Sequence, residues 1–178
     1  MMKTYSDISH VIALSCHVDY FDVKEGTLSR PICSSRLKSY EAFLKGMPKY
    51  TPQMIINGRY DAVGYLPDKI EIAFDHAYNY PVKPVVIEHV GFEFEWPVYY
   101  VLLPEIRKGR YQLWLIAYDF PRSLTVRGGA NLGKNMTYYN TVSKAKFLGS
   151  WNGESKNITI DEKLPEETKG FAFIVQDV

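Results

Sequence analysis

Apolar residues in the first part of the chain follow two different patterns. Residues 10–22, HVIALSCHVDYFD, form a run rich in β-branched and aromatic side chains, which predicts a strand buried on both faces. After a polar loop, apolar side chains recur at helical spacing from a serine cap, Ser34 or Ser35, to the stop signals Gly46 and Pro48. The sequence therefore predicts a strand followed by a helix.

A hairpin and a second helix are predicted next. The run QMII at residues 53–56 ends in an Asn-Gly pair that favours a two-residue hairpin turn, and YDAVGY at residues 60–65 returns. Pro67 then begins a stretch with one apolar face at helical spacing and acidic residues in its first turn. Because a central strand rejects proline, Pro52 should precede the first hairpin strand, and we expect the Thr51–Pro52 peptide bond to be cis.

Beyond residue 81 the pattern is that of short strands. In VGFEFEW, at residues 90–96, apolar and polar side chains alternate, which is typical of a strand with one face in a core. Further runs of this kind are separated by Gly, Pro and Asn turns: VYYVLL, YQLWLIAYDF, YYNTVSKAKF, NITID and FAFIVQ. The sequence thus predicts an α+β chain, with an α/β domain at residues 1–80 and an antiparallel, β-sandwich-like domain at residues 81–178.

Composition and charge exclude several classes of protein. The 178 residues are 46% hydrophobic and 15% aromatic with a formal net charge of +1, as expected for a soluble globular protein. No window concentrates Lys and Arg enough to follow phosphates, so nucleic acid is not an expected partner. No apolar run approaches the roughly 20 residues needed to span a bilayer, and the first ten residues lack the pattern of a secretory signal.

The cysteines and histidines predict neither a metal site nor a cofactor site. Cys16 and Cys33 are too few for a disulfide scaffold or a four-thiolate zinc site, and the four histidines lack the paired spacing of a metalloprotease helix. No nucleophile elbow or phosphate loop is present, so no cofactor is expected. Because Cys16 lies within the predicted strand and Cys33 at the start of the following helix, we expect two free thiols and no disulfide between them.

Three separated blocks of sequence resemble a known family. HVDYFD at residues 17–22, TPQMIINGR at residues 51–59 and ANLGKNMTYYNTV at residues 130–142, which is followed by LGSWNG, are similar in kind and order to the bacterial secreted family catalogued as domain of unknown function 1223. The resemblance spans nearly the whole chain. One departure is Ala130, where an acidic residue is usual in the family.

This resemblance implies a thioredoxin-like domain followed by a β-rich domain, in a secreted or periplasmic protein with no established reaction. Full-length members look as if they begin with a secretion signal and a strand that leads into a Cys-x-x-Cys helix start, and that unit is absent from this sequence. Thioredoxin chemistry needs a reactive thiolate, a resolving thiol and a cis-proline loop. By resemblance, the chain keeps only the cis-proline element.

Cys33 could be a remnant of the missing pair, because it stands at a predicted helix start where Arg36 would favour a thiolate. Chain length argues against such a one-cysteine site. About 35 residues or more are needed between a thioredoxin active-site cysteine and the cis-proline, whereas Cys33 and Pro52 are 19 positions apart. We therefore expect Cys33 to belong to the later helix, where its side chain either packs or contacts solvent.

A candidate site also lies at the end of the predicted first strand. His17 and Asp19 share one face of an extended strand, while Cys16 and Tyr20 share the other. The pair His17 and Asp19 could polarise a substrate group or bind a metal, or both residues could be hydrogen-bonded structural residues. In the second half, Tyr138, Asn140 and Trp151 could form a ligand surface or pack in the core and corners.

Two classes of function remain open. The chain could be a non-catalytic binding protein that holds a protein or peptide ligand in a groove of Thr51, Pro52 and Gln53. It could instead be a thiol-disulfide oxidoreductase whose Cys-x-x-Cys lies upstream of this sequence. Loss of the strand that bears this motif would leave VIALSCHV, at residues 11–18, as an unpaired edge, so self-association is also expected.

Overall fold

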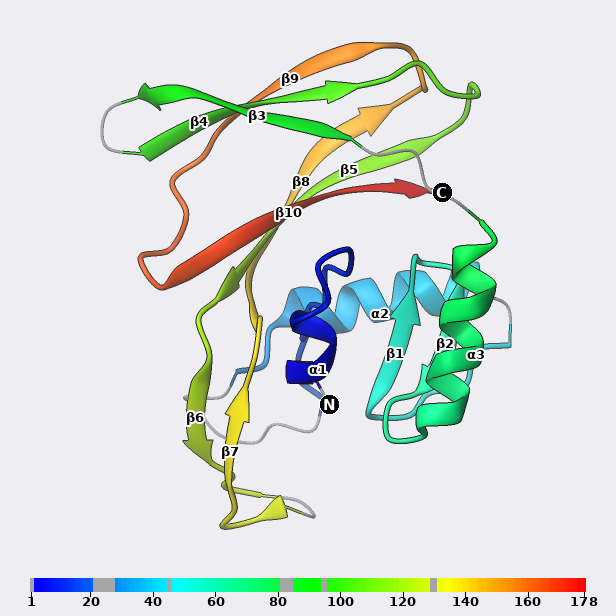
Figure 1. Cartoon of the computed structure of the whole chain (residues 1–178), viewed down its shortest axis with the longest axis vertical. Helices are drawn as coiled ribbons and strands as arrows, with labels where there is room; N and C mark the ends of the chain where they lie inside the picture. Colours follow the sequence, from blue (N-terminus) through cyan, green and yellow to red (C-terminus); the bar gives the residue numbers. More distant parts are fainter. Residues whose placement is uncertain (1, 21–27, 45, 81–84, 94–95, 129–130) are drawn as a thin grey trace. The chain divides into compact units, whose positions relative to one another are not determined.

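The structure, a computed structural model, describes residues 2–20, 28–44, 46–80, 85–93, 96–128 and 131–178 (Figure 1). The chain divides into two compact units. The β-rich unit comprises Met1–Ser34 and Val86–Val178, and the hairpin unit comprises Ser35–Val85. The predicted boundary after residue 80 lies near the second of these junctions, but the first 34 residues belong with the β-rich part rather than with the hairpin.

The described residues form helices and antiparallel strands, as the predicted α+β class requires. No helix among them is both long and apolar enough to cross a membrane. In chain order the elements are α1 (Met2–Ser6), α2 (Pro31–Phe43), β1 (Gln53–Ile56), β2 (Tyr60–Val63), α3 (Pro67–Tyr78), β3 (Val86–Glu93), β4 (Trp96–Leu103), β5 (Tyr111–Asp119), β6 (Arg122–Thr125), β7 (Asn135–Tyr138), β8 (Val142–Trp151), β9 (Lys156–Asp161) and β10 (Thr168–Asp177).

The predicted hairpin is confirmed in the hairpin unit. β1 pairs with β2 in antiparallel register, and Ile56 lies opposite Tyr60. Asn57 and Gly58 have φ angles of 49° and 67°, the left-handed conformation that an Asn-Gly pair adopts readily. The Arg59 N–H donates to the Ile56 carbonyl at 3.0 Å and closes the turn. Because Ile56 and Tyr60 are partners, Arg59 is an additional loop residue beyond the predicted pair.

Both predicted helices are present. α3 begins at Pro67, as expected for a proline in a first turn, and it buries Ile70, Ala73 and Ala77 on one face. α2 begins at Pro31, before the predicted serine cap, because proline also fits the first position of that helix. Cys33 therefore lies within the first turn of α2 rather than ahead of it.

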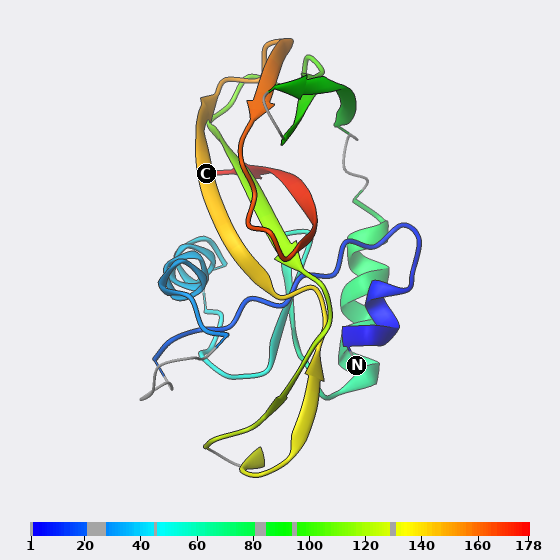
Figure 2. The same ribbon diagram turned by 90° about the vertical axis from the view of Figure 1, so that its left-hand side faces the viewer.

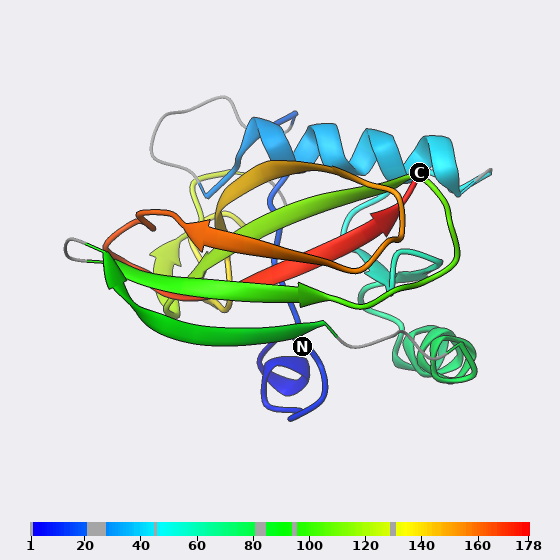
Figure 3. The same cartoon turned by 90° about the horizontal axis from the view of Figure 1, so that it is seen from above.

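The β-rich unit contains two three-stranded sheets, with the strand orders β10-β5-β8 and β3-β4-β9. Every neighbouring pair is antiparallel, which confirms the prediction for the second half of the chain. β4 lies between β3 and β9 (Figure 3). The two sheets meet where Tyr99 of β4 packs against Phe171 of β10, with ring centroids 4.8 Å apart.

The central strands of this unit continue into a two-stranded ribbon. β6 follows β5 and β7 precedes β8, and β6 pairs with β7 in antiparallel register (Figure 2). The side chains of the ribbon are mostly exposed or half-buried, whereas β5 buries Leu113, Leu115, Ile116 and Ala117. The core of the unit therefore centres on β5.

Residues 11–18 do not form the predicted strand buried on both faces, so that prediction is wrong. The segment is irregular apart from Ser15, which makes an isolated parallel bridge to Thr141. The Ser15 N–H donates to the Asn140 carbonyl, and the Ser15 carbonyl accepts from the Val142 N–H, both at 2.9 Å. These bonds connect the backbone of Ser15 to Asn140 and to Val142, the first residue of β8. The described residues 11–18 therefore do not form the unpaired edge strand on which the expected self-association rested, and self-association itself stays an untested prediction.

Candidate functional sites

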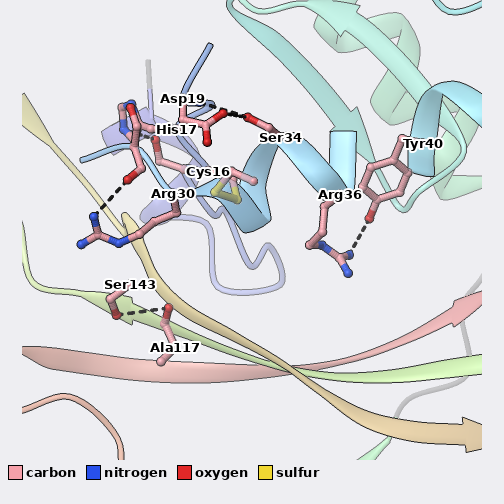
Figure 4. Close-up of a disulfide and its surroundings, with 12 residues drawn as sticks. Cys16, His17, Asp19, Arg30, Ser34, Arg36, Tyr40, Ala117 and Ser143 are labelled. Atoms are coloured by element: carbon pink, nitrogen blue, oxygen red, sulfur yellow. Dashed lines mark hydrogen bonds between the residues drawn. A yellow bond between two sulfur atoms is a disulfide. The ribbon is translucent and has the colours of Figure 1, made fainter. Parts of the chain in front are cut away.

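Cys16 and Cys33 form a disulfide beside the first turn of α2, with their Cα atoms 5.3 Å apart (Figure 4). The prediction of two free thiols is therefore wrong. The physical reason is a return of the chain, because the Arg30 N–H donates to the His17 carbonyl at 3.0 Å. This bond brings the start of α2 alongside residues 16–19, whereas the residue pattern suggests a strand and a helix that are separated along the chain.

The two sulfur-bearing residues have different surroundings. Cys33 is only 2% exposed and belongs to a buried cluster with Ile116, Val142 and Ala172. Cys16, in contrast, is an exposed residue on the irregular segment. Of the two roles expected for Cys33, packing and solvent contact, the structure therefore shows packing, and the residue is also covalently bound. The disulfide joins the core of the β-rich unit to its surface.

Asp19 and Ser34 make a second connection between the same two segments. The Ser34 hydroxyl accepts a hydrogen bond from the Asp19 N–H at 3.0 Å, and it donates a short hydrogen bond to the Asp19 carboxylate (Figure 4). The sequence marked Ser34 as a helix cap and did not indicate this contact, which becomes recognisable only once α2 lies beside residue 19.

His17 and Asp19 have separate partners. His17 Nε2 lies 3.1 Å from Ser15 Oγ, and its ring packs edge-on against Tyr138 with centroids 5.2 Å apart, while Asp19 binds Ser34. Tyr20 is 51% exposed. Within the described ranges, no group of three or more His, Cys, Asp or Glu side chains could hold a metal ion. The arrangement supports the structural alternative for His17 and Asp19.

Asn140 and Trp151 occupy packing positions. Asn140 is 7% exposed; its amide donates to the Ala13 carbonyl at 2.9 Å, and its Oδ1 accepts from Lys169 at 3.0 Å. Trp151 is 6% exposed and donates through Nε1 to the Glu154 carbonyl at 2.6 Å. Both side chains are therefore engaged in the core and corners of the β-rich unit.

The hairpin unit contains the Thr51–Gln53 segment. The Thr51–Pro52 peptide bond is cis, the isomer expected from the sequence. Thr51 and Pro52 are exposed and Gln53 is half-buried. The Gly64 N–H donates to the Pro52 carbonyl at 2.8 Å, and a Cβ atom at Gly64 would lie 3.0 Å from that same carbonyl oxygen. Glycine thus allows β2 to approach the segment closely.

Asp61 gathers the polar side chains around this segment. The Tyr50 hydroxyl donates to Asp61 Oδ2 at 2.6 Å, and Gln53 Nε2 donates to the same oxygen at 3.3 Å. Three effects raise the pKa of Tyr50 to about 12. The largest is burial, and the hydrogen bond to Asp61 and the negative charge of Asp61 add to it. The phenol therefore remains a neutral donor at physiological pH. No motif in the sequence marks Tyr50 or Asp61, because their proximity arises from the hairpin pairing.

Two open hollows adjoin Asp61 within the hairpin unit. One, of about 360 Å³, lies between β2 and α3, and the other, of about 390 Å³, adjoins the end of α2. Arg59 and Asp61 line both. The first hollow is lined by Tyr50, Arg59, Tyr60, Asp61, Ala62, Val63, Leu66, Lys69, Ile72, Ala73 and His76.

Comparison with protein families identifies the chain. The model of a family described as "Protein of unknown function (DUF1223)" matches residues 1–176. The chain belongs to this family. The family match extends over all three sequence blocks that suggested it, including Ala130, which lies outside the residues that the structure describes. Among curated proteins, none is significantly similar to this DUF1223 chain.

A solved structure is similar to the DUF1223 chain. It is the crystal structure of a protein from Agrobacterium tumefaciens, with a TM-score of 0.66 and 21% sequence identity. The similarity covers 84% of this chain and 64% of that protein. At this identity the comparison establishes a common fold, and the DUF1223 chain corresponds to about two thirds of the longer protein.

Proposed function

We propose that this protein is a binding protein with a partial thioredoxin-like domain, and that its hairpin unit holds an extended segment of a peptide or protein ligand. The order helix, strand, antiparallel strand, helix from α2 to α3 supports the thioredoxin-like assignment, since a thioredoxin domain ends in the same order. Binding of this kind requires a groove beside β2 but no chemistry within it, and Tyr50, which lines the 360 Å³ hollow there, directly precedes Thr51, Pro52 and Gln53.

The hollow beside β2 is the observation on which this proposal rests. The four consecutive residues of β2, Tyr60 to Val63, all line the 360 Å³ hollow, together with Arg59 of the preceding turn. Side chains of a strand alternate between its faces, so a hollow that touches every residue in a row lies along the edge of the strand. An extended ligand at that edge can pair with backbone groups of β2, the mode of recognition known as β-strand addition.

The lining suggests which ligand segments would bind. Arg59, Lys69 and His76 place cationic or titratable groups on the rim, whereas Tyr60 and Ile72 supply apolar surface. The Asp61 carboxylate already accepts hydrogen bonds from Tyr50 and Gln53. We therefore propose an extended ligand that combines apolar with acidic side chains, because these complement the hollow in shape and charge.

The experiment uses an unfolded acidic polypeptide as the probe. Fluorescently labelled α-lactalbumin, reduced and carboxymethylated so that it cannot refold, is titrated with the protein, and anisotropy reports binding. We expect a Kd in the micromolar range. Gly64→Ala should weaken binding at least about tenfold, roughly 1.4 kcal/mol, because the new Cβ displaces the Pro52 backbone.

Gly128→Ala is the matched control, because a Cβ there meets no atom within 4 Å. This variant should bind as the unchanged protein does. Equal affinities of the Gly64→Ala and Gly128→Ala variants, or no binding at all by the unchanged protein, would refute the proposal that the groove beside β2 binds the ligand. A variant with both cysteines replaced by serine should still bind the probe when circular dichroism shows that it is folded, which separates this function from thiol chemistry.

We also propose that the protein resides in an oxidising compartment, periplasmic or extracellular. The Cys16–Cys33 disulfide supports this proposal, since such bonds persist mainly in oxidising compartments. Acid quenching of cells, followed by alkylation with a maleimide-polymer, should leave the native protein unmodified. A doubly modified protein recovered from unstressed cells would contradict this localisation.

A further inference from the structure

The Cys16–Cys33 disulfide is unequally accessible at its two ends. Cys33 is 2% exposed among Ile116, Val142 and Ala172, whereas Cys16 lies on the exposed irregular segment. A thiolate that opens a disulfide must reach one sulfur directly, from the side opposite the bond that breaks. The buried cluster surrounds Cys33, whereas Cys16 is the exposed residue of the pair and therefore the end at which we expect attack.

We infer that Cys16–Cys33 is a redox-active pair that exchanges with dithiols, with Cys16 as the sulfur that is attacked and Cys33 as the leaving sulfur, which attacks the mixed disulfide when the reaction runs in reverse. This inference concerns the β-rich unit alone and does not depend on ligand binding by the hairpin unit. Dithiols in this sense are molecules or proteins that carry two neighbouring thiol groups and act as two-electron reductants.

The exchange proceeds in two balanced steps. A thiolate of the dithiol attacks Cys16 Sγ, a new S–S bond forms, and the bond between Cys16 and Cys33 breaks. Its electron pair passes to Cys33 Sγ, which takes up a proton. The second thiol of the dithiol then attacks the first sulfur of the dithiol, which is bound to Cys16 in the mixed disulfide. This step closes a disulfide within the dithiol and releases the Cys16 thiolate, which is also protonated. Two electrons and two protons thus pass from the dithiol to the protein.

The position of Cys33 in the first turn of α2 favours the first step. The N-terminal turn of a helix carries a partial positive charge, which stabilises the negative charge that develops on a leaving sulfur. The Cys33 N–H itself donates to the Arg30 carbonyl at 2.9 Å, so the turn remains in place around the sulfur. The leaving group is therefore held in position for the reverse reaction.

Two sets of hydrogen bonds keep the cysteines close when the covalent bond is open. The Arg30 N–H binds the His17 carbonyl at 3.0 Å on one side. On the other side, Asp19 and Ser34 bind each other through two hydrogen bonds. Both sets connect the segment of Cys16 with the start of α2. The reduced thiols therefore remain within reach of each other, and reoxidation is an intramolecular event with a high effective concentration.

The first test compares single-cysteine variants in the folded state. Cys33→Ser leaves Cys16 alone and should react with dithionitrobenzoate at least about 100-fold faster than Cys16→Ser, whose remaining thiol is buried. Cys16→Ser should react quickly only after guanidinium unfolds it. Mass spectrometry of Cys33→Ser incubated with oxidised glutathione should find glutathione on Cys16. Equal rates for the two folded variants would overturn the assignment of roles.

The unchanged protein provides a second test that does not depend on whether the variants fold. Oxidised protein is treated with dithiothreitol under native conditions, samples are alkylated over time, and the two cysteine peptides are quantified. We expect reduction without loss of the far-ultraviolet circular dichroism signal, and complete reoxidation by oxidised glutathione. Reduction that occurs only as fast as global unfolding would refute an exchange site.

Ser34 is a positioning residue in this scheme, and Ser39 is its matched control. The Ser39 hydroxyl also lies on α2, but it is exposed and donates to the Ser35 carbonyl of its own helix, at 3.2 Å. Ser34→Ala should slow reoxidation of the reduced pair at least about threefold, since the effective concentration of the thiols falls. Ser39→Ala should leave the rate unchanged. Similar reoxidation rates in both variants would show that Ser34 does not hold the pair together.

Discussion

Gly153 is the residue at which the backbone of the β-rich unit is most demanding. Its φ angle is +97°, a conformation that residues with a side chain rarely adopt. A Cβ atom there would lie 2.6 Å from the Arg107 carbonyl oxygen. In return, the Gly153 carbonyl accepts from the Ile106 N–H at 2.8 Å. The glycine thus lets the turn after β8 contact the loop before β5, and it explains the last residue of the LGSWNG block.

We expect Gly153→Ala to lower the free energy of unfolding by about 3 kcal/mol, because it combines an unfavourable φ angle with a backbone clash. Urea unfolding followed by tryptophan fluorescence measures the change. Gly128→Ala is the control and should change stability by less than about 0.5 kcal/mol. Coincident unfolding curves for the two variants would show that the turn relaxes around the added methyl group.

The cysteines illustrate what a residue pattern alone can establish. The spacing of Cys33 and Pro52 placed Cys33 on the later helix, with packing and solvent contact both open, and the structure shows the packed alternative. The sequence did not reveal the disulfide, since the contact depends on the hydrogen bond from Arg30 to His17 that reverses the chain. The available signal was the even number of cysteines together with resemblance to a secreted family.

Among the contacts between secondary-structure elements, Glu162 forms ion pairs that connect the end of β9 with β8. Lys144 and Lys146 lie on β8, two residues apart and therefore on one face, and both donate short hydrogen bonds to the Glu162 carboxylate that follows β9. The hydrogen bonds from the two lysines lower the pKa of Glu162, and the bond from Lys144 has the larger effect. This ion-pair cluster connects the two sheets of the β-rich unit at their polar border.

The lowered pKa predicts a pH-dependent contribution to stability. A carboxyl group with a lower pKa in the folded state stabilises the fold above its unfolded pKa, near 4.5, and loses this contribution as the pH falls further. Glu162→Gln should therefore reduce stability by roughly 1 kcal/mol at pH 7, and by much less at pH 3. Urea unfolding at both pH values measures this. The exposed control Glu166→Gln should have little effect at either, and an equal loss at both would exclude the charge as the cause.

Elements with local signals were predictable, and elements defined by distant partners were not. The Asn57-Gly58 turn and Pro67 fix the hairpin and α3 through their own backbone preferences. Residues 11–18 have strand-like composition, but among the described residues their pairing is the isolated bridge of Ser15 to Thr141, beside the start of β8. Composition can indicate burial, but pairing depends on which residues of the rest of the chain come close.

At the scale of the whole molecule, the β-rich unit is built from both ends of the chain. Leu14 and Cys33 from the first segment pack into the cluster of Ile116, Val142 and Ala172. The sequence placed its domain boundary where helical periodicity stops, and it could not show that the first segment contributes to the later core. Periodicity describes local conformation, whereas membership of a unit depends on contacts between distant residues.

A fragment comparison tests this organisation. Residues 86–178 alone should melt at least about 10 °C below a chain in which residues 1–34 are joined to residues 86–178 by a Gly-Ser linker, because the fragment lacks the disulfide and buried side chains of the first segment. Circular dichroism follows the melting. The fragment should also bind a hydrophobic dye. Equal melting temperatures for the two proteins would mean that residues 1–34 add nothing to the unit.

The bond between Asn140 and Ala13, which spans 127 positions, also sets an order of events during synthesis. At roughly 5–20 residues per second, the ribosome delivers Asn140 about 6–25 s after Ala13. Cys16 and Cys33 are 17 positions apart and leave the ribosome well before the strands that bury Cys33. In a nascent chain both sulfurs therefore meet solvent and cellular thiols alike. Only the completed protein distinguishes an outer from an inner sulfur.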